Sequence, residues 1–289
     1  MTSLRCAPAA QARGDPLHGT APPANGYVLI EQPGAWGVNA TGSARLPQDV
    51  LAHLVGECRA RGSRLLLVRR TLRAPESPLR IGVADSRRGR ERIAWSSFDD
   101  PSELLDRSLE LPDDGPPGEP ALLTCTHGRR DPCCARRGWP VTQALVAARP
   151  DQAWQCSHVG GDRFAANLVV LPHGLYFGHV TPESALEVAD AVERGDVILH
   201  LLRGRSVDAP AVQSALYYAY REREERRIDA VVPVWSRTDG DRHIVGLEHG
   251  GDELVVHLRR EVSEPIERLT CSGGPSRYER FALQAIEAR

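Results

Sequence analysis

The chain has 289 residues, enough for two or three domains that each bury a hydrophobic core. Its net charge is only -2, from 36 basic and 38 acidic residues, so no long-range field favours nucleic acid or a membrane surface. The sequence contains no lysine, which excludes Schiff-base and P-loop chemistry, and no run of about 20 apolar residues that predicts a membrane span. We therefore expect partners other than nucleic acid or membranes.

The first 25 residues are rich in alanine, proline and glycine, and we expect them to form a partly ordered arm. Residues 26–111 alternate strand and helix patterns, which predicts an N-terminal α/β domain. Helical spacing of apolar residues predicts a helix over 46–61. The other expected elements are strands at 27–32, 64–70, 79–84 and 93–95 and a helix at 101–109.

A proline-rich segment, 112–120, separates this region from the next one. It reads PDDGPPGEP, with four prolines and two glycines among nine residues. Such a composition favours neither helix nor strand. We predict a linker here.

The next unit, 121–204, carries four of the seven cysteines. An apolar run from Ala121 predicts a strand that ends at Cys125, and a loop with Cys133 and Cys134 is expected after it. A strand pair is predicted at 168–171 and 175–179, joined by a Pro-His-Gly turn.

A helix is expected to close this unit. Thr181 is a good N-cap and Pro182 suits the first helical position. The Cys and His residues of the unit therefore stand at the ends of predicted strands, where a fold can bring them together.

The last region, 205–289, predicts a small α/β extension. Asp208 is expected to cap a helix that runs to about residue 226. Strands are predicted at 230–235, 243–248 and 253–258, with glycine-containing turns between them.

Several short motifs together resemble the sucrase/ferredoxin-like family. They are Cys125-x-His127, Arg130-Asp131, Cys134 and the run Cys156-Ser157-His158-x-Gly160-Gly161-Asp162-Arg163-Phe164-Ala165, and the resemblance extends upstream to residues 15–37. Members of this family look like thioredoxin-fold [2Fe-2S] ferredoxins. The resemblance implies a thioredoxin-like ferredoxin domain at 121–204, and the N-terminal domain has the same element order without the cysteines.

The resemblance also implies a set of cluster ligands. Two cysteines of the first loop, Cys125 and Cys134, would hold one iron. The positions that match the second ligand pair are His158 and Asp162, where some members of the family have two histidines. The sequence keeps the first histidine and departs from the pattern at the second.

The residues themselves leave the fourth ligand open. Asp162 fits the register of the family pattern and offers an anionic oxygen. Cys156 offers a softer thiolate, which iron–sulfur chemistry favours, but on an extended strand it points back into the sheet. The third alternative is that the site has no conventional fourth ligand.

Four further residues are candidates for contacts to the cofactor. Gly160 and Gly161 would give backbone room beside a cluster, with amide N–H groups available to its sulfides. Arg163 would offset the charge of the cluster or of Asp162. His127 is either a hydrogen-bond donor behind the ligands or simply a histidine at a strand end.

The remaining cysteines have plainer interpretations. We expect Cys6, Cys58 and Cys271 to be small buried apolar residues. Cys133 would be a packing or spare thiol, or a redox partner of Cys134. Seven cysteines spread over a long chain do not form a secreted disulfide framework, and no signal peptide opens the sequence, so we expect a reducing cytoplasm.

These features predict a [2Fe-2S] protein that transfers one electron to or from a redox partner, a reductase or an electron acceptor. Whether it is also an enzyme is left open, since no GxSxG, Walker or GxGxxG motif is present. The alternatives are a thiol-redox enzyme, a cluster-dependent catalyst acting on a small molecule, and a zinc-stabilised binding module. Zinc would use Cys125, Cys134, Cys156 and His158.

Overall fold

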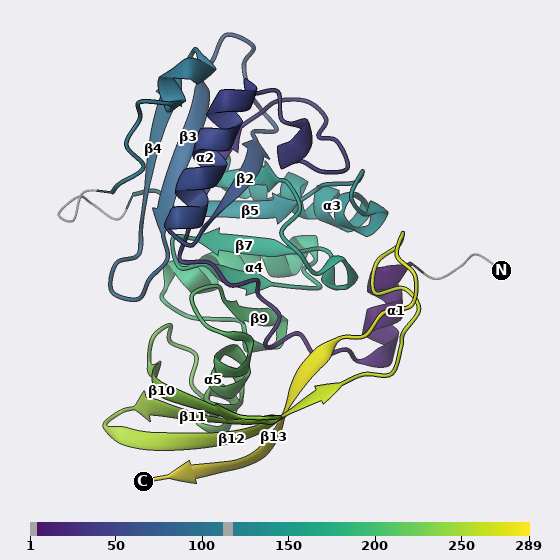
Figure 1. Ribbon diagram of the computed structural model, residues 1–289, viewed down its shortest axis with the longest axis vertical. Helices are drawn as coiled ribbons and strands as arrows, with labels where there is room; N and C mark the ends of the chain where they lie inside the picture. The colour runs from purple at the N-terminus through teal and green to yellow at the C-terminus, as the bar shows by residue number, and fades with distance from the viewer. Residues whose placement is uncertain (1–4, 112–117) are drawn as a thin grey trace.

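The computed structural model describes residues 5–111 and 118–289. These residues form a mixed sheet of nine strands, five α-helices and a separate antiparallel sheet of four strands (Figure 1). The prediction of an α/β fold is confirmed. In the described part of the chain, no helix is both long and apolar enough to cross a membrane.

The N-terminal half of the large sheet follows the predicted element order. Its elements are β1 (Gly26–Glu31), α2 (Gln48–Ala60), β2 (Ser63–Arg69), β3 (Leu79–Asp85) and β4 (Arg92–Phe98). The helix predicted at 101–109 is only a 3-10 helix, Pro101–Leu104. Leu104 and Leu109 enter the same core, and five-residue spacing would place them on different faces of an α-helix.

The C-terminal half repeats this order. Its elements are β5 (Ala121–Cys125), α3 (Pro132–Ala148), β6 (Ala153–Cys156), a 3-10 helix (Asp162–Phe164), β7 (Leu168–Leu171), β8 (Leu175–Phe177) and α4 (Pro182–Glu193), and β9 (Leu202–Arg205) extends the sheet. Thr181 caps α4 through a reciprocal bond with Ser184, as predicted. The predicted first strand, strand pair and closing helix are present, and α3 and β6 lie between them where no helix or strand was predicted.

The two halves share one continuous sheet, in the order β4-β3-β1-β2-β6-β5-β7-β8-β9. The first two strands of each half are parallel, and a hairpin lies beside the first strand. Strands β2 and β6 join the halves antiparallel through the pairs Val68–Cys156 and Arg69–Gln155, close to their carboxyl ends. The loops after β1 therefore lie near the loops after β5 and β6.

The predicted domain boundaries stay predictions. One continuous sheet crosses the predicted junction between 111 and 121. Residues 112–117 of the predicted linker lie outside the described residues.

Cys133 and Cys134 lie in the first turn of α3, so the predicted loop is wrong. The side chain of Asp131 caps the helix by accepting the Cys133 N–H at 2.8 Å, and Pro132 occupies the first helical position. A Cβ added to Gly138 would lie 2.2 Å from the carbonyl oxygen of Cys125. This glycine lets α3 pack directly against the end of β5.

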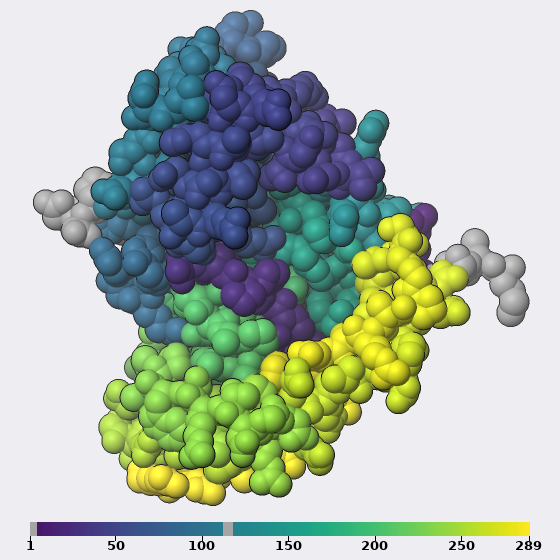
Figure 2. Space-filling model, in the orientation of Figure 1, coloured from purple at the N-terminus to yellow at the C-terminus, as the bar shows by residue number. Residues whose placement is uncertain are grey.

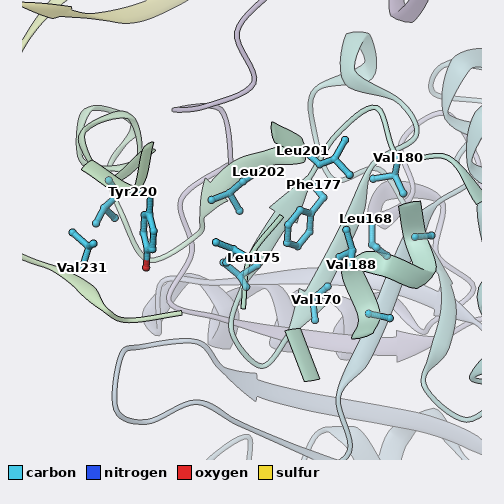
Figure 3. Close-up of a cluster of buried hydrophobic side chains, with 14 of the residues drawn as sticks. Leu168, Val170, Leu175, Phe177, Val180, Val188, Leu201, Leu202, Tyr220 and Val231 are labelled. Carbon is cyan, nitrogen blue, oxygen red and sulfur yellow. The ribbon is translucent and has the colours of Figure 1, made fainter. Parts of the chain in front are cut away.

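The C-terminal extension consists of α5 (Pro210–Glu222) and a meander of β10 (Val231–Asp239), β11 (Arg242–His249), β12 (Asp252–Val262) and β13 (Glu279–Ala288). The predicted cap is wrong, because Asp208 pairs with Arg88 and Ala209 occupies the N-cap. Apolar side chains of α5 and β10 continue the core under β8 and β9, as Tyr220 and Val231 do beside Leu202 and Leu175 (Figure 3).

The expected partly ordered arm contains a helix, α1 (Cys6–Arg13). Its Cys6, Ala7 and Ala10 side chains are fully buried, which explains why an alanine-rich segment is ordered here. The segment between β12 and β13 packs beside it (Figure 1). In Figure 2 this C-terminal segment, drawn in yellow, covers the place that α1 occupies in Figure 1.

Candidate metal centre

Three candidate ligands converge at one edge of the large sheet. Cys125 is the last residue of β5, Cys134 lies in the first turn of α3, and His158 follows β6. Because β5 and β6 are parallel, their carboxyl ends meet at the same edge, where α3 also begins. The two sulfurs and a ring nitrogen of His158 all lie within 4.8 Å of one another.

Asp162 completes this first group of Cys125, Cys134, His158 and Asp162. Its Oδ1 lies 3.4 Å from the Cys134 sulfur and 3.1 Å from Nδ1 of His158. That nitrogen is buried and makes no well-aligned hydrogen bond in spite of the short distance. Burial raises the pKa of the Asp162 carboxyl. A buried nitrogen without a hydrogen bond, beside a carboxylate and two sulfurs, fits a metal better than a hydrogen-bond network.

The surroundings shift the pKa values of the two thiols of the first group in opposite directions. A hydrogen bond from the Cys134 thiol, assisted by the neighbouring His158, holds the pKa of Cys125 well below its usual range. The same hydrogen bond, together with burial, raises the pKa of Cys134. Both side chains are fully buried. The lowered pKa of Cys125 favours its thiolate, the form that binds metal.

Cys156 lies next to the first group. It is opposite Cys125 in the β5–β6 pair and opposite Val68 across the seam, and it shares a core cluster with Cys125, Cys134 and Trp154. Its sulfur is not part of the first group. Burial raises its pKa. Asp162 contacts two residues of the first group, Cys134 and His158, whereas no hydrogen bond of the Cys156 side chain with these residues is seen in the described part of the chain.

His127 is not a member of the first group but is hydrogen-bonded to the backbone of one member, His158. Its Nε2–H donates to the carbonyl oxygen of Gly37 at 2.6 Å, and its Nδ1 accepts the backbone N–H of His158 at 3.2 Å. Burial lowers its pKa, in keeping with a neutral ring. Both ring nitrogens are thus engaged, and His127 fixes the backbone of His158 against the loop that carries Trp36 and Gly37.

The two predicted glycines adopt left-handed backbone conformations, with φ of 90° at Gly160 and 77° at Gly161. A Cβ on Gly161 would lie 2.5 Å from Nη2 of Arg203. The carbonyl of Gly160 accepts from Nη1 of the same arginine at 2.9 Å. The room that Gly161 leaves is therefore filled by Arg203, and that at Gly160 is bordered by Pro22.

Arg163 points away from Asp162. Its Nε lies 3.4 Å from Oδ2 of Asp15, and its guanidinium stacks over Phe164 and Tyr278. It ties the loop of the first group to the N-terminal segment and the C-terminal segment.

Arg203 is the residue that the sequence analysis missed. It is fully buried on β9 and donates to Gly160, to Asn167 Oδ1 at 2.8 Å and to the backbone and hydroxyl of Thr20. Burial lowers its pKa to about 10. The available signal was the arginine–glycine alternation of Leu202–Arg205 at the end of an apolar stretch, which is unusual for a core strand. Its bonds hold the loop from 158 to 167 in place.

Access to the first group is through His158. Its side chain is 23% exposed, whereas that of Asp162 is 5% exposed and both cysteines are buried. Any exchange of protons or electrons with the surroundings therefore passes most directly through the imidazole.

The fold and the first group define an α/β protein with a buried two-thiol, imidazole and carboxylate centre. The profile described as "Sucrase/ferredoxin-like" matches residues 17–204, more than half of the chain, so the protein belongs to the sucrase/ferredoxin-like family. The match includes every residue of the first group.

A curated relative is the altered inheritance of mitochondria protein 32 of Candida glabrata. It is 28% identical over 98 residues, which cover 29% of this chain and 31% of that protein. The chain thus spans less than a third of the relative that it matches. A comparison with solved structures gave no match.

Proposed function

We propose that this protein binds a [2Fe-2S] cluster and exchanges single electrons with a protein partner, either a reductase or an electron acceptor. Cys125 and Cys134 are assigned to one iron, and His158 and Asp162 to the other. The observation that carries the proposal is the convergence of Cys125, Cys134 and His158 at the carboxyl ends of β5 and β6, with Asp162 in contact with the last two of them.

The donor set fits this cofactor. Iron–sulfur clusters require thiolates, and imidazole replaces thiolate on one iron in centres of raised potential. When bound, the cluster supplies one-electron oxidation and reduction. The buried thiols exclude water from one side, and the partly exposed His158 gives a partner a short path to the centre.

The surface around the first group suits an acidic partner. Arg129, Arg130 and Arg136 are exposed near the start of α3, and Trp139 on the same helix is 43% exposed. Exposed tryptophan and arginine are typical of protein interfaces. Positive charge here would attract an acidic reductase and favour the reduced form of an anionic cluster.

We also propose a cytoplasmic location. All seven cysteines are free thiols, including two pairs whose sulfurs lie 3.4 and 3.5 Å apart. Thiols this close persist unpaired in a reducing compartment.

A single zinc ion is the second candidate for the first group. Ligand atoms about 2.0–2.3 Å from one tetrahedral ion lie roughly 3.3–3.8 Å from each other. The short contacts of Asp162 with Cys134 and His158 are close to this spacing. In this case the protein would be a redox-silent, zinc-stabilised binding module.

The geometry does not favour the thiol-redox alternative. The sulfur of Cys134 contacts Asp162, whereas that of Cys133 contacts Cys271. Vicinal cysteines whose sulfurs face different partners are not arranged to form a disulfide with each other.

The decisive experiment is anaerobic purification followed by iron, sulfide and zinc analysis, with absorption and EPR spectra before and after reduction by dithionite. It compares the wild type with Asp162→Ala and with the matched variant Cys156→Ala. We expect two irons and two sulfides per chain, an altered reduced spectrum in Asp162→Ala and an unaltered one in Cys156→Ala. A colourless wild type with one zinc would reject the cluster, and an altered spectrum in Cys156→Ala alone would reject Asp162 as a ligand.

A further inference from the structure

A second group of thiols lies on the other side of the start of α3. It consists of Cys6, Asp131, Cys133 and Cys271, whose ligand atoms all lie within 4.8 Å of one another. The Cys271 sulfur is 3.4 Å from that of Cys6 and 3.5 Å from that of Cys133. The Cys6 sulfur is 3.6 Å from both carboxylate oxygens of Asp131. Nothing in the spacing of these residues along the chain predicts this arrangement.

The second group joins three distant parts of the chain. Cys6 opens α1, Cys133 lies in the first turn of α3, and Cys271 lies in the segment between β12 and β13. Cys6 and Cys271 are 265 residues apart. Both also lie outside the family match at 17–204, so the group is an addition to the family's shared region.

Backbone N–H groups point at the atoms of the second group. Helix α1 has no side-chain cap, and its Cys6 and Ala7 N–H groups donate to the sulfurs of Cys271 and Cys133. The carboxylate of Asp131 accepts the N–H groups of Cys133 at 2.8 Å and of Cys271 at 2.7 Å. Two helix N-termini thus face the group, and both favour negative charge there.

Packing alone does not account for this arrangement. A buried thiol behaves as a small apolar residue, yet here three thiols surround a fully buried carboxylate. Burying a carboxylate is costly without a cation, and its contacts in the second group are two N–H groups and thiols.

A disulfide is also a poor explanation. A sulfur–sulfur bond is about 2.05 Å long, and pairing any two of these three thiols would leave the third unpaired beside them. Three sulfurs and one carboxylate instead match the four-coordinate thiolate-rich sites that zinc occupies.

A third group of candidate ligands differs from the second because an arginine already compensates the charge of its carboxylates. The residues Glu91, His173 and Asp229 also lie close together, but the guanidinium of Arg205 pairs with both carboxylates. Their charge is already compensated. Among the residues that the structure describes, no guanidinium lies within ion-pair distance of Asp131 in the second group, and the cation that its geometry fits is a metal ion.

We propose that Cys6, Cys133, Cys271 and Asp131 bind a structural Zn²⁺ ion that ties the N-terminal helix and the C-terminal segment to the start of α3. Each Asp131 oxygen accepts one N–H bond and retains a lone pair for the metal. The ion closes two loops of more than a hundred residues, where the entropy of an unlinked chain is largest. It also holds in place the helix turn that carries Cys134.

The test is zinc binding by the full-length chain, purified with reductant and without added metal, in the variants Cys271→Ser and Cys58→Ser. Cys271 is half-buried whereas Cys6 and Cys133 are buried, so its replacement is least disruptive to folding. Cys58 is a buried thiol of α2 in a separate core cluster and serves as the matched control. We expect Cys271→Ser to bind one equivalent of zinc less than the wild type, and Cys58→Ser to bind as much.

Cobalt gives an independent signature of the ligands. In a Cys125→Ser/Cys134→Ser background, which removes the thiols of the first group, one equivalent of Co²⁺ should still produce intense sulfur-to-cobalt charge-transfer absorption. That absorption should fall severalfold when Cys271→Ser is added and persist when Cys58→Ser is added. Iron content in the wild-type background reports on the first group separately, so the two proposals fail independently.

Two results would overturn the proposal. One is an unchanged zinc stoichiometry in Cys271→Ser. The other is a disulfide that includes Cys271, detected by mass spectrometry after alkylation of the denatured, unreduced wild type. Should the Cys125→Ser/Cys134→Ser background not fold, the zinc stoichiometry of the single variants decides the question alone.

Discussion

Cys133 and Cys134 are consecutive in the first turn of α3, yet their sulfurs belong to two different groups. The Cys134 sulfur lies 3.4 Å from Oδ1 of Asp162, and the Cys133 sulfur lies 3.5 Å from the sulfur of Cys271. Successive residues of an α-helix point about 100° apart, so one helix start can serve two sites. A substitution in either group is therefore expected to displace the ligands of the other, because both groups use the first turn of α3.

Replacing His158 by cysteine should lower the reduction potential of the proposed cluster and make it independent of pH. The wild-type potential should fall as pH rises from 6 to 9, because reduction increases the proton affinity of a histidine ligand. The limiting slope is about 59 mV per pH unit for one electron and one proton. A cysteine ligand adds negative charge and does not titrate once bound.

The measurement is protein-film voltammetry of the wild type and of His158→Cys over that pH range. The variant Cys156→Ala serves as a control for loss of a nearby thiol. A flat wild-type profile would contradict histidine ligation.

Replacing Gly138 by alanine should damage both the fold and the first group. The added Cβ would lie 2.2 Å from the Cys125 carbonyl oxygen, so α3 must move away from β5 and carry Cys134 with it. Overpacking of this kind costs about 1–3 kcal/mol in the free energy of unfolding. Denaturant unfolding and metal analysis should show a loss of stability and of bound metal together.

The matched control is Gly56→Ala. Gly56 is an exposed glycine of α2, and an added Cβ there would meet no atom within 4 Å. Because alanine favours helix over glycine, this variant should gain about 0.5–1 kcal/mol. Equal behaviour of the two variants would refute a steric role for Gly138.

His18 should make the protein less stable in mild acid. It stacks on Tyr217 with ring centroids 4.4 Å apart, and its Nδ1 lies 3.1 Å from the hydroxyl of Ser214. Burial, assisted by the charge of Arg221, lowers its pKa to about 4 from an unfolded value of 6.5. As pH falls below 6.5, His18 becomes protonated in the unfolded chain but stays neutral in the folded chain until pH is about 4. The free energy of unfolding therefore decreases between pH 6.5 and 4.

The size of this effect is about 2–3 kcal/mol, from about 1.4 kcal/mol per pKa unit. It is measured as the difference in unfolding free energy between pH 7 and pH 4.5. The variant His18→Phe keeps a ring on Tyr217 but cannot titrate, so its loss should be smaller by about that amount. An equal loss in both proteins would show that His18 does not contribute.

Much of the large sheet was predictable from the sequence because its signals are local. Strands β1, β2, β7 and β8 are short apolar runs, and α4 begins with a threonine cap and a proline. The start of α3 has the same signal of a helix start, with Asp131 as the N-cap and Pro132 at the first helical position. The expected loop at Cys133 and Cys134 overlooks this signal. Strand β13 was missed because its sequence, ERFALQAIEA, has no clear alternation of apolar and polar residues.

The sequence by itself indicated the family, most strands of the large sheet and three candidate ligands of the first group, because periodicity, caps and motif spacing are properties of neighbouring residues. Only the tertiary structure placed the Asp162 carboxylate in contact with Cys134 and His158, since β6 ends at Cys156 and the chain then turns. It alone brought Cys6 and Cys271 to Cys133. Contacts between segments more than a hundred residues apart depend on how the whole sheet is assembled, and no local pattern encodes them.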